Sequence, residues 1–264
     1  MGARQSMTTF GTMGLLVSLL VVGGCSGGKS SAEVATKVPT TKTVVVLLDK
    51  TASIRDQNGV FKDALTRIVA SLRGGDKFRL AEITGSSEDD FSFIVSENIP
   101  APPKYNMLSD NKTAYDHTMK VDKATRIAIR KSLAQKVRIE LRKTPKAMST
   151  DLFGAINTVG LYLSNKSDTK KILVILSDMI EEDNHGHFQR IKWSDKKRQE
   201  ILTRETNLGL VPNLTGVSVY VVGARSPRIS TTQNIRFFWT EYFKATHATL
   251  LPQHYAHSLL SWTE

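Results

Sequence analysis

Three uninterrupted apolar runs constrain the fold of this chain more than any other feature. They are TVVVLL at 43–48, KKILVILS at 170–177 and GVSVYVVGA at 216–224, and all three are rich in β-branched residues. A strand that is apolar on both faces has to be covered on both faces. Stretches with apolar residues at three- and four-residue spacing, which is a helical period, separate and follow these runs. The alternation predicts an α/β protein with a doubly wound, mostly parallel sheet and helices on both faces.

Weaker patterns complete this outline. KFRLAEI at 77–83 and FSFIVSENI at 91–99 read as strands, and the short polar link between them predicts one antiparallel edge strand. Residues 104–118 are polar and are expected to be irregular. The remaining helical patterns cover residues 58–73, 120–143, 151–164, 188–207 and 232–248.

Carboxylates and hydroxyls stand where the apolar runs end. Asp49, Thr51 and Ser53 follow the first run, and Asp178 follows the second. Thr150 lies between them, just before a predicted helix. Ligands of open α/β sheets bind beyond the carboxyl ends of the strands, so these side chains are expected at the functional edge. Such oxygen donors suit a hard divalent cation, although each alone would also suit a helix cap.

The three segments together resemble the von Willebrand factor A domain with its metal-ion-dependent adhesion site. The resemblance covers about residues 43–248 and rests on D-x-T-x-S, on the Thr before DLFGAI, and on the apolar strand that ends in SD. Two positions depart from the common pattern, because Ala52 and Met179 stand where many members have glycine. The resemblance implies a metal site formed by Asp49, Thr51, Ser53, Thr150 and Asp178.

The same resemblance implies a function. It implies bound Mg²⁺, or Mn²⁺ or Ca²⁺ in its place, and a binding module with no catalytic residues. The ion would engage an Asp or Glu side chain of a partner protein.

Two alternatives remain open at this stage. LLDKTAS also resembles the phosphorylation motif of haloacid-dehalogenase-like phosphohydrolases, in which Asp49 would be the nucleophile. Position 51 is Thr, however, where those phosphatases need a second Asp, and STDLFGAI has no role in that scheme. The second alternative is a metal-free structural scaffold of the same fold.

The N-terminal part predicts export and lipid anchoring. Residues 14–24 form an uncharged run, shorter than the roughly 20 residues that span a bilayer, and VGGC ends at Cys25, the single cysteine. We therefore expect a lipoprotein signal peptide at 1–25 with lipidation at Cys25, a flexible tether at 26–42 and a folded domain at 43–264. The expected location is the cell envelope on the extracytoplasmic side. Ser26, in place of Asp, favours the outer over the inner membrane of a two-membrane cell.

The chain is strongly basic, with a formal net charge of +11. Residues 120–146 alone hold ten Lys and Arg against two acidic residues. Such a charge suits nucleic acid, an anionic membrane or an acidic protein partner, and the helix pattern is also typical of a solvated face. The expected lipid anchor argues against nucleic acid.

Overall fold

The computed structural model describes residues 41–144, 149–166, 169–183, 186–226 and 228–264. Pro39–Glu264 forms one compact unit. The expected signal peptide, Cys25 and nearly all of the expected tether lie outside the described residues. Within them, no helix is both long and apolar enough to cross a membrane. In chain order the elements are β1 (Lys42–Asp49), η1 (Ala52–Gln57), α1 (Asn58–Ser71), β2 (Lys77–Ile83), β3 (Phe93–Asn98), α2 (Lys112–Arg142), α3 (Leu152–Ser164), β4 (Lys170–Leu176), α4 (Asp195–Asn207), β5 (Val217–Val222), α5 (Ile229–Ala245), η2 (Pro252–His254) and β6 (Tyr255–Ala256).

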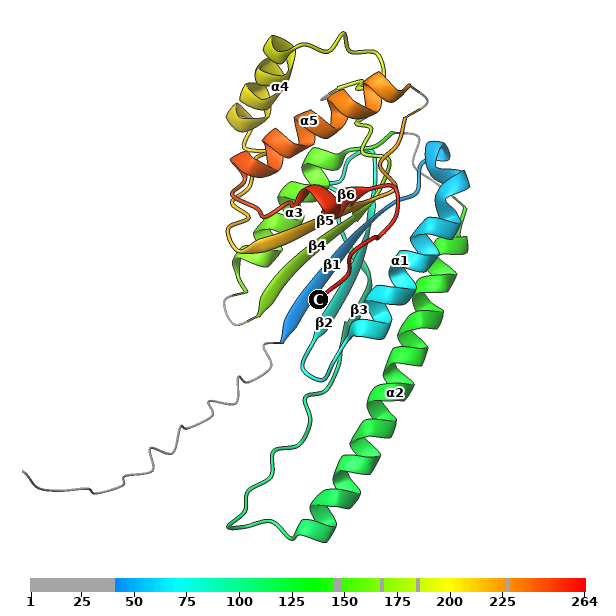
Figure 1. Cartoon of the computed structure of the whole chain (residues 1–264), viewed down its shortest axis with the longest axis vertical. Helices are drawn as coiled ribbons and strands as arrows, with labels where there is room; N and C mark the ends of the chain where they lie inside the picture. The colour runs from blue at the N-terminus through cyan, green and yellow to red at the C-terminus, as the bar shows by residue number, and fades with distance from the viewer. Residues whose placement is uncertain (1–40, 145–148, 167–168, 184–185, 227) are drawn as a thin grey trace, which may run out of the picture. The chain divides into compact units, whose positions relative to one another are not determined.

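The described strands form one sheet in the order β3-β2-β1-β4-β5-β6 (Figure 1). β1 lies in the middle and pairs in parallel with β2 and β4. β5 and β6 continue the sheet in parallel, and β3 is antiparallel to β2. This topology confirms the expected mostly parallel sheet with one antiparallel strand at its edge. The two-residue β6 was not predicted, since a strand so short has no period to detect.

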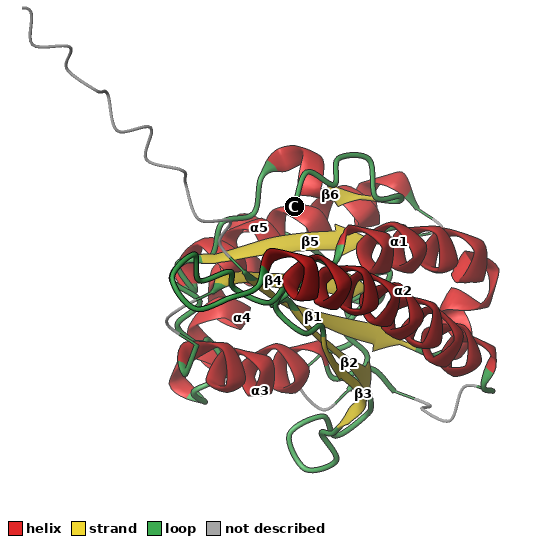
Figure 2. Cartoon of the chain, turned by 90° about the horizontal axis from the view of Figure 1, so that it is seen from below, coloured by secondary structure: helices red, strands yellow, loops and turns green. Residues whose placement is uncertain are grey.

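Helices cover both faces of the sheet because the strands are apolar on both faces. Val45 and Leu47 of β1 pack in one core with α3, α4 and α5, while Val44, Val46 and Leu48 pack in the other with α1 and α2. Figure 2 shows α1 and α2 side by side on their face of the sheet. All five of these β1 side chains are fully buried, so the apolar run is explained by burial on two sides.

The starts of α2 and α4 differ most from the sequence prediction. α2 begins at Lys112, so residues 112–118, expected to be irregular, are helical. The Asn111 side chain caps this end by accepting hydrogen bonds from the amides of Thr113 and Ala114, a polar start that apolar periodicity does not reveal. α4 begins only at Asp195, where the Ser194 side chain caps it. Residues 188–194 were expected to be helical and are not.

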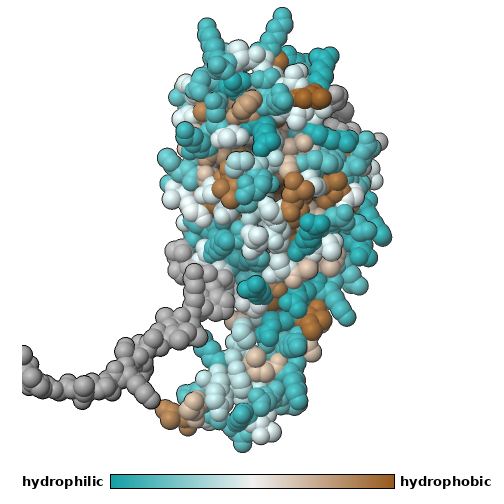
Figure 3. Space-filling model, viewed as in Figure 1, coloured by the Kyte–Doolittle hydropathy of each residue, from teal (hydrophilic) through white to brown (hydrophobic). Residues whose placement is uncertain are grey.

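α2 buries less than its pattern suggested. Leu133 and Val137 are its buried residues, whereas Ile127, which lies at helical spacing from other apolar residues of the pattern, is 38% exposed. Most of the helix therefore carries solvated polar and charged side chains. The face of the molecule in Figure 3 is correspondingly mainly hydrophilic, with apolar side chains scattered over it.

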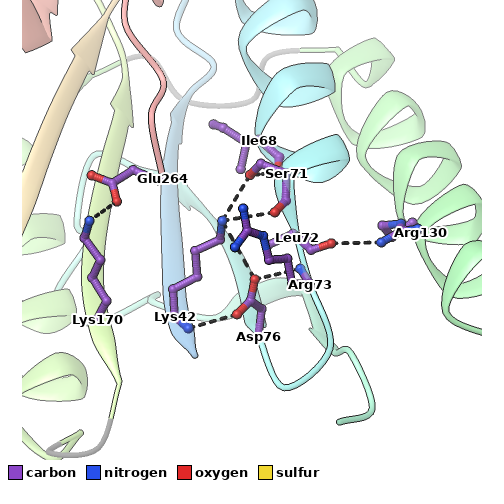
Figure 4. A network of polar contacts seen from close by, with 9 residues as sticks. All are labelled: Lys42, Ile68, Ser71, Leu72, Arg73, Asp76, Arg130, Lys170 and Glu264. Carbon is purple, nitrogen blue, oxygen red and sulfur yellow. Dashed lines mark hydrogen bonds and ion pairs between the residues drawn. The ribbon is translucent and has the colours of Figure 1, made fainter. Parts of the chain in front are cut away.

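Polar contacts anchor the amino end of β1, opposite the predicted site (Figure 4). The buried Asp76 accepts hydrogen bonds from the backbone amides of Lys42 at 2.9 Å and Arg73 at 2.7 Å. The Lys42 ammonium group donates to the carbonyl of Ser71 at the end of α1. These contacts set how β1 enters the sheet, and the register with its neighbours then sets which residues emerge at the carboxyl edge.

Candidate functional site

Asp49 is the last residue of β1 and lies fully buried at the carboxyl edge of the sheet. Its Oδ1 accepts hydrogen bonds from the amide and the hydroxyl of Thr51, both at 2.9 Å. Its Oδ2 accepts one from the hydroxyl of Ser177 at 2.7 Å. Burial raises the pKa of Asp49 above its ordinary value, and the hydrogen bonds from Thr51 and Ser177 partly offset that effect. The carboxylate is thus held in one orientation by neighbours on both sides.

Asp178 follows β4, the strand next to β1. Leu48 is paired with Leu176, so Ser177 and Asp178 emerge from the sheet beside Asp49. Asp178 is 5% exposed, and its Oδ1 accepts a hydrogen bond from the amide of Ile180 at 3.0 Å. The Ser177 hydroxyl, besides donating to Asp49, accepts from the amide of Met179. The segment after β4 is therefore tied directly to the end of β1.

Thr150 reaches the same edge from the segment before α3. Its amide and carbonyl each hydrogen-bond the backbone of Glu182 at 3.1 Å. The amide of the next residue, Asp151, donates to the carbonyl of Thr84 just beyond β2. Thr150 is 4% exposed. The structure therefore brings Asp49, Thr51, Thr150 and Asp178 to one edge of the sheet; Ser53 lies in η1, and its side chain is outside the described part.

Met179 keeps the backbone form that glycine favours. Its φ is +65°, in the left-handed region that L-residues adopt at a cost. Its side chain is fully buried, and its carbonyl accepts a hydrogen bond from the indole N–H of Trp239 in α5 at 2.9 Å. The departure from glycine noted in the sequence therefore leaves the turn after Asp178 in place, because packing and this hydrogen bond support it.

A second group of acidic residues adjoins the site. Carboxylate oxygens of Asp151, Glu181 and Asp183 all lie within 4.8 Å of one another, close enough to hold a metal ion. Asp151 also caps α3 through the amide of Gly154, and Glu181 accepts from the amide of Leu152. Complete burial raises the pKa of Glu181 well above its ordinary value, and Asp183 raises it further. The predicted metal site did not include Asp151, Glu181 or Asp183, although the acidic run EED at 181–183 directly follows the segment that carries Asp178.

The residues at the edge fit a hard cation chemically. Asp49 and Asp178 offer carboxylate oxygens, and Thr51 and Thr150 offer hydroxyls, which is the donor chemistry of Mg²⁺, Mn²⁺ or Ca²⁺ sites. The Thr51 hydroxyl donates a hydrogen bond to Asp49, which leaves the lone pairs of the hydroxyl oxygen able to coordinate a cation. Asp49, fixed from both sides, orients that hydroxyl as a supporting group.

No protein-family model and no curated protein matches this chain. Among solved structures, the open form of the pilus adhesin SpaC from Lactobacillus rhamnosus GG aligns with 80% of this chain and 28% of its own, at 10% identity and a TM-score of 0.46. A von Willebrand factor type A protein from Catenulispora acidiphila aligns with 80% of this chain over 38% of its own length, at 13% identity and a TM-score of 0.40. BatB from Bacteroides thetaiotaomicron aligns with 80% of this chain over 90% of its own length, at 14% identity and a TM-score of 0.39. The aligned region is less than half the length of the first two proteins.

The strand order, the antiparallel edge strand and the helical layers on both faces confirm the expected von Willebrand factor A-like fold.

Proposed function

We propose that this chain is a protein-binding module that holds a divalent cation of the Mg²⁺ type at the carboxyl edge of its sheet. Asp49, Thr51, Ser53, Thr150 and Asp178 are the proposed ligands and supporting groups. The ion would supply an open coordination position for an Asp or Glu carboxylate of a partner protein. The module has no catalytic residue in this proposal.

One observation supports the proposal most directly. Oxygen-bearing side chains from three separate segments gather at one edge, and hydrogen bonds already hold two of these segments together through Asp49 and Ser177. Burying the Asp49 carboxylate is costly unless charge or hydrogen bonds compensate it. A cation at this edge would provide such compensation.

Calorimetric titration of the full chain with Mg²⁺ tests the metal site. Wild type should bind the ion. Thr51→Val removes a hydroxyl ligand at nearly constant volume and should weaken binding by at least about tenfold, which corresponds to a loss of about 1.4 kcal/mol of binding free energy. Asp63→Ala, on the exposed side of α1, is the matched control and should bind as wild type. No binding by wild type would refute the proposal.

A further variant separates the two groups of oxygen donors. Asp183→Asn changes the acidic group formed with Asp151 and Glu181 but leaves Asp49, Thr51 and Thr150 intact. We expect it to keep most of its Mg²⁺ affinity. If Asp183→Asn loses the ion while Thr51→Val keeps it, the ion belongs to the acidic group and the predicted ligand set is wrong.

We also propose that the module is tethered to a membrane of the cell envelope, on the extracytoplasmic side, through lipid at Cys25. The support is the apolar run at 14–24 and the VGGC sequence that follows it. Cys25→Ser should move the protein from the membrane fraction to the soluble fraction. An equally firm membrane association of this variant would contradict the anchor.

The alternatives predict different results in the same preparations. A phosphohydrolase would turn over a generic phosphoester, and Asp49→Asn would abolish that turnover. A metal-free scaffold would keep both its stability and its partner binding in chelator. Both oxygens of Asp49 accept hydrogen bonds, an arrangement that suits a supporting group better than a nucleophile.

A further inference from the structure

A cavity of about 760 Å³ lies beside the proposed metal site. Asp49 and Thr51 form part of its wall, while Thr150 and Asp178 do not, so the cavity extends from the site toward the α1 and α2 face of the sheet. The rest of the wall comes largely from α1 and from the last turns of α2. A group bound at the metal site would therefore have this cavity as its immediate neighbour.

The wall of this cavity is strongly basic. Among the described residues that line it, Asp49 is the single acidic one. Five are basic, from α1, from the last turns of α2 and from the positions just after β1 and α2: Lys50, Lys62, Arg138, Arg142 and Lys143. Lys50 forms an ion pair with Glu82 at 2.5 Å, and Lys143 forms one with Glu140 at 2.7 Å. Among the described residues, no ion pair or hydrogen bond is found for the charged groups of Lys62, Arg138 and Arg142. We refer to these three residues as the basic wall.

The basic wall is not fully explained by helix stability. Arg142 is in the last turn of α2, where a cation is favourable because the carbonyl end of a helix is negative. Arg138 is one turn earlier, and like charges four residues apart on a helix repel each other. Lys62 adds a third positive charge from a different helix. An anionic ligand would relieve this repulsion.

We propose that the basic wall binds acidic side chains of the same partner segment whose carboxylate reaches the metal. The partner is then a protein segment with several Asp or Glu residues close together, and not one isolated acidic residue. This inference rests on the proposed function, because the metal site sets where the segment enters. Arginine guanidinium groups suit this role, since they bind carboxylates through two parallel hydrogen bonds. A hollow of this volume can take side chains of a chain segment, whereas a flat membrane surface would not fill it.

The experiment uses the full chain and two labelled peptides of equal length, one with tetraglutamate and one with a single glutamate among glutamines. The test variant is Lys62→Glu with Arg138→Glu, both on exposed side chains. The matched control is Lys120→Glu with Lys131→Glu, which makes the same charge change at exposed positions of α2 outside the cavity. Lys62→Gln with Arg138→Gln serves if the glutamate variant does not fold.

In the presence of Mg²⁺, wild type should bind the tetraglutamate peptide at least about tenfold more tightly than the single-glutamate peptide. This preference should fall as salt is added. The test variant should lose most of that preference while binding Mg²⁺ at least as tightly as wild type, because negative charge in place of positive charge near the site favours a cation. The control should keep the preference. Equal losses in the two variants, or no loss in either, would overturn the proposal. So would a test variant that binds both peptides normally but no longer binds anionic phospholipid vesicles, because the basic wall would then be a membrane contact.

The metal site and the basic wall can be tested separately. If wild type binds no Mg²⁺, the metal proposal fails by itself. Tetraglutamate binding in chelator that depends on Lys62 and Arg138 would then still show that the basic wall binds acidic segments. If Mg²⁺ binds and the peptide preference is absent, the metal site stands and the basic wall has no part in partner recognition.

Discussion

The contact between Trp239 and Met179 leads to a sharp prediction about how α5 supports the site. The indole N–H donates to the carbonyl of Met179 at 2.9 Å, and both residues are fully buried. Met179 directly follows Asp178, so this bond connects α5 to the loop that carries a proposed metal ligand. Trp239→Phe keeps an aromatic ring but removes the donor. The carbonyl of Met179 then stays buried without the indole bond.

The expected cost follows from two contributions. Leaving a buried carbonyl without its partner costs about 1–3 kcal/mol. The smaller ring leaves a void of a few tens of Å³, which adds about 1 kcal/mol at roughly 24 cal/mol per Å³. The free energy of unfolding should fall by about 2–4 kcal/mol. For a domain of this size each kcal/mol lowers Tm by about 2–4 °C, so the loss should be about 5–15 °C.

Tyr242→Phe is the matched comparison. Its hydroxyl, one turn later in α5, donates to the carbonyl of Leu210 at 2.6 Å, in the link before β5 and not in the Asp178 loop. This variant should also lose about 1–3 kcal/mol. Thermal unfolding and Mg²⁺ calorimetry on both variants are the assays, and we expect only Trp239→Phe to weaken Mg²⁺ binding. An unchanged Tm for Trp239→Phe, or equal losses of Mg²⁺ affinity in both, would refute this reasoning.

Three other changes test separate parts of the structure. His247, exposed just after α5, has φ +61°, so His247→Gly should raise the free energy of unfolding by about 0.5–1 kcal/mol in urea titrations. Met179→Gly should instead lower it by about 1–4 kcal/mol, because the lost buried side chain outweighs the relieved backbone; a stabilised variant would contradict this. For Glu264, burial alone would raise the pKa, but the Lys170 ammonium and the Tyr220 hydroxyl outweigh it and lower the pKa below its ordinary value. Ionised Glu264 therefore stabilises the folded state at pH values above its unfolded pKa, and this stabilisation is lost as pH falls through its folded pKa. Glu264→Gln should flatten the pH dependence of Tm over that acidic range, as measured by thermal unfolding at several pH values.

The apolar runs made most of the sheet predictable. β1, β2, β4 and β5 lie within two residues of their expected ranges, because burial on both faces demands continuous apolar sequence. The short β6 and the polar start of α2 were missed because neither depends on a long apolar pattern. The former depends on pairing with β5, and the latter on a single cap at Asn111.

The sequence by itself also determined which oxygen donors stand at the end of each element. Asp49 and Asp178 had to reach the same edge once their runs were parallel neighbours. Only the tertiary structure decided that Asp151, Glu181 and Asp183 meet, and that Lys62 of α1 and Arg138 of α2 line one cavity next to Asp49. These meetings depend on how separate elements pack across the sheet. Polar side chains at a loop or helix surface carry no periodic signal of their distant neighbours, so their proximity emerges only when the packed layers fix the distances between them.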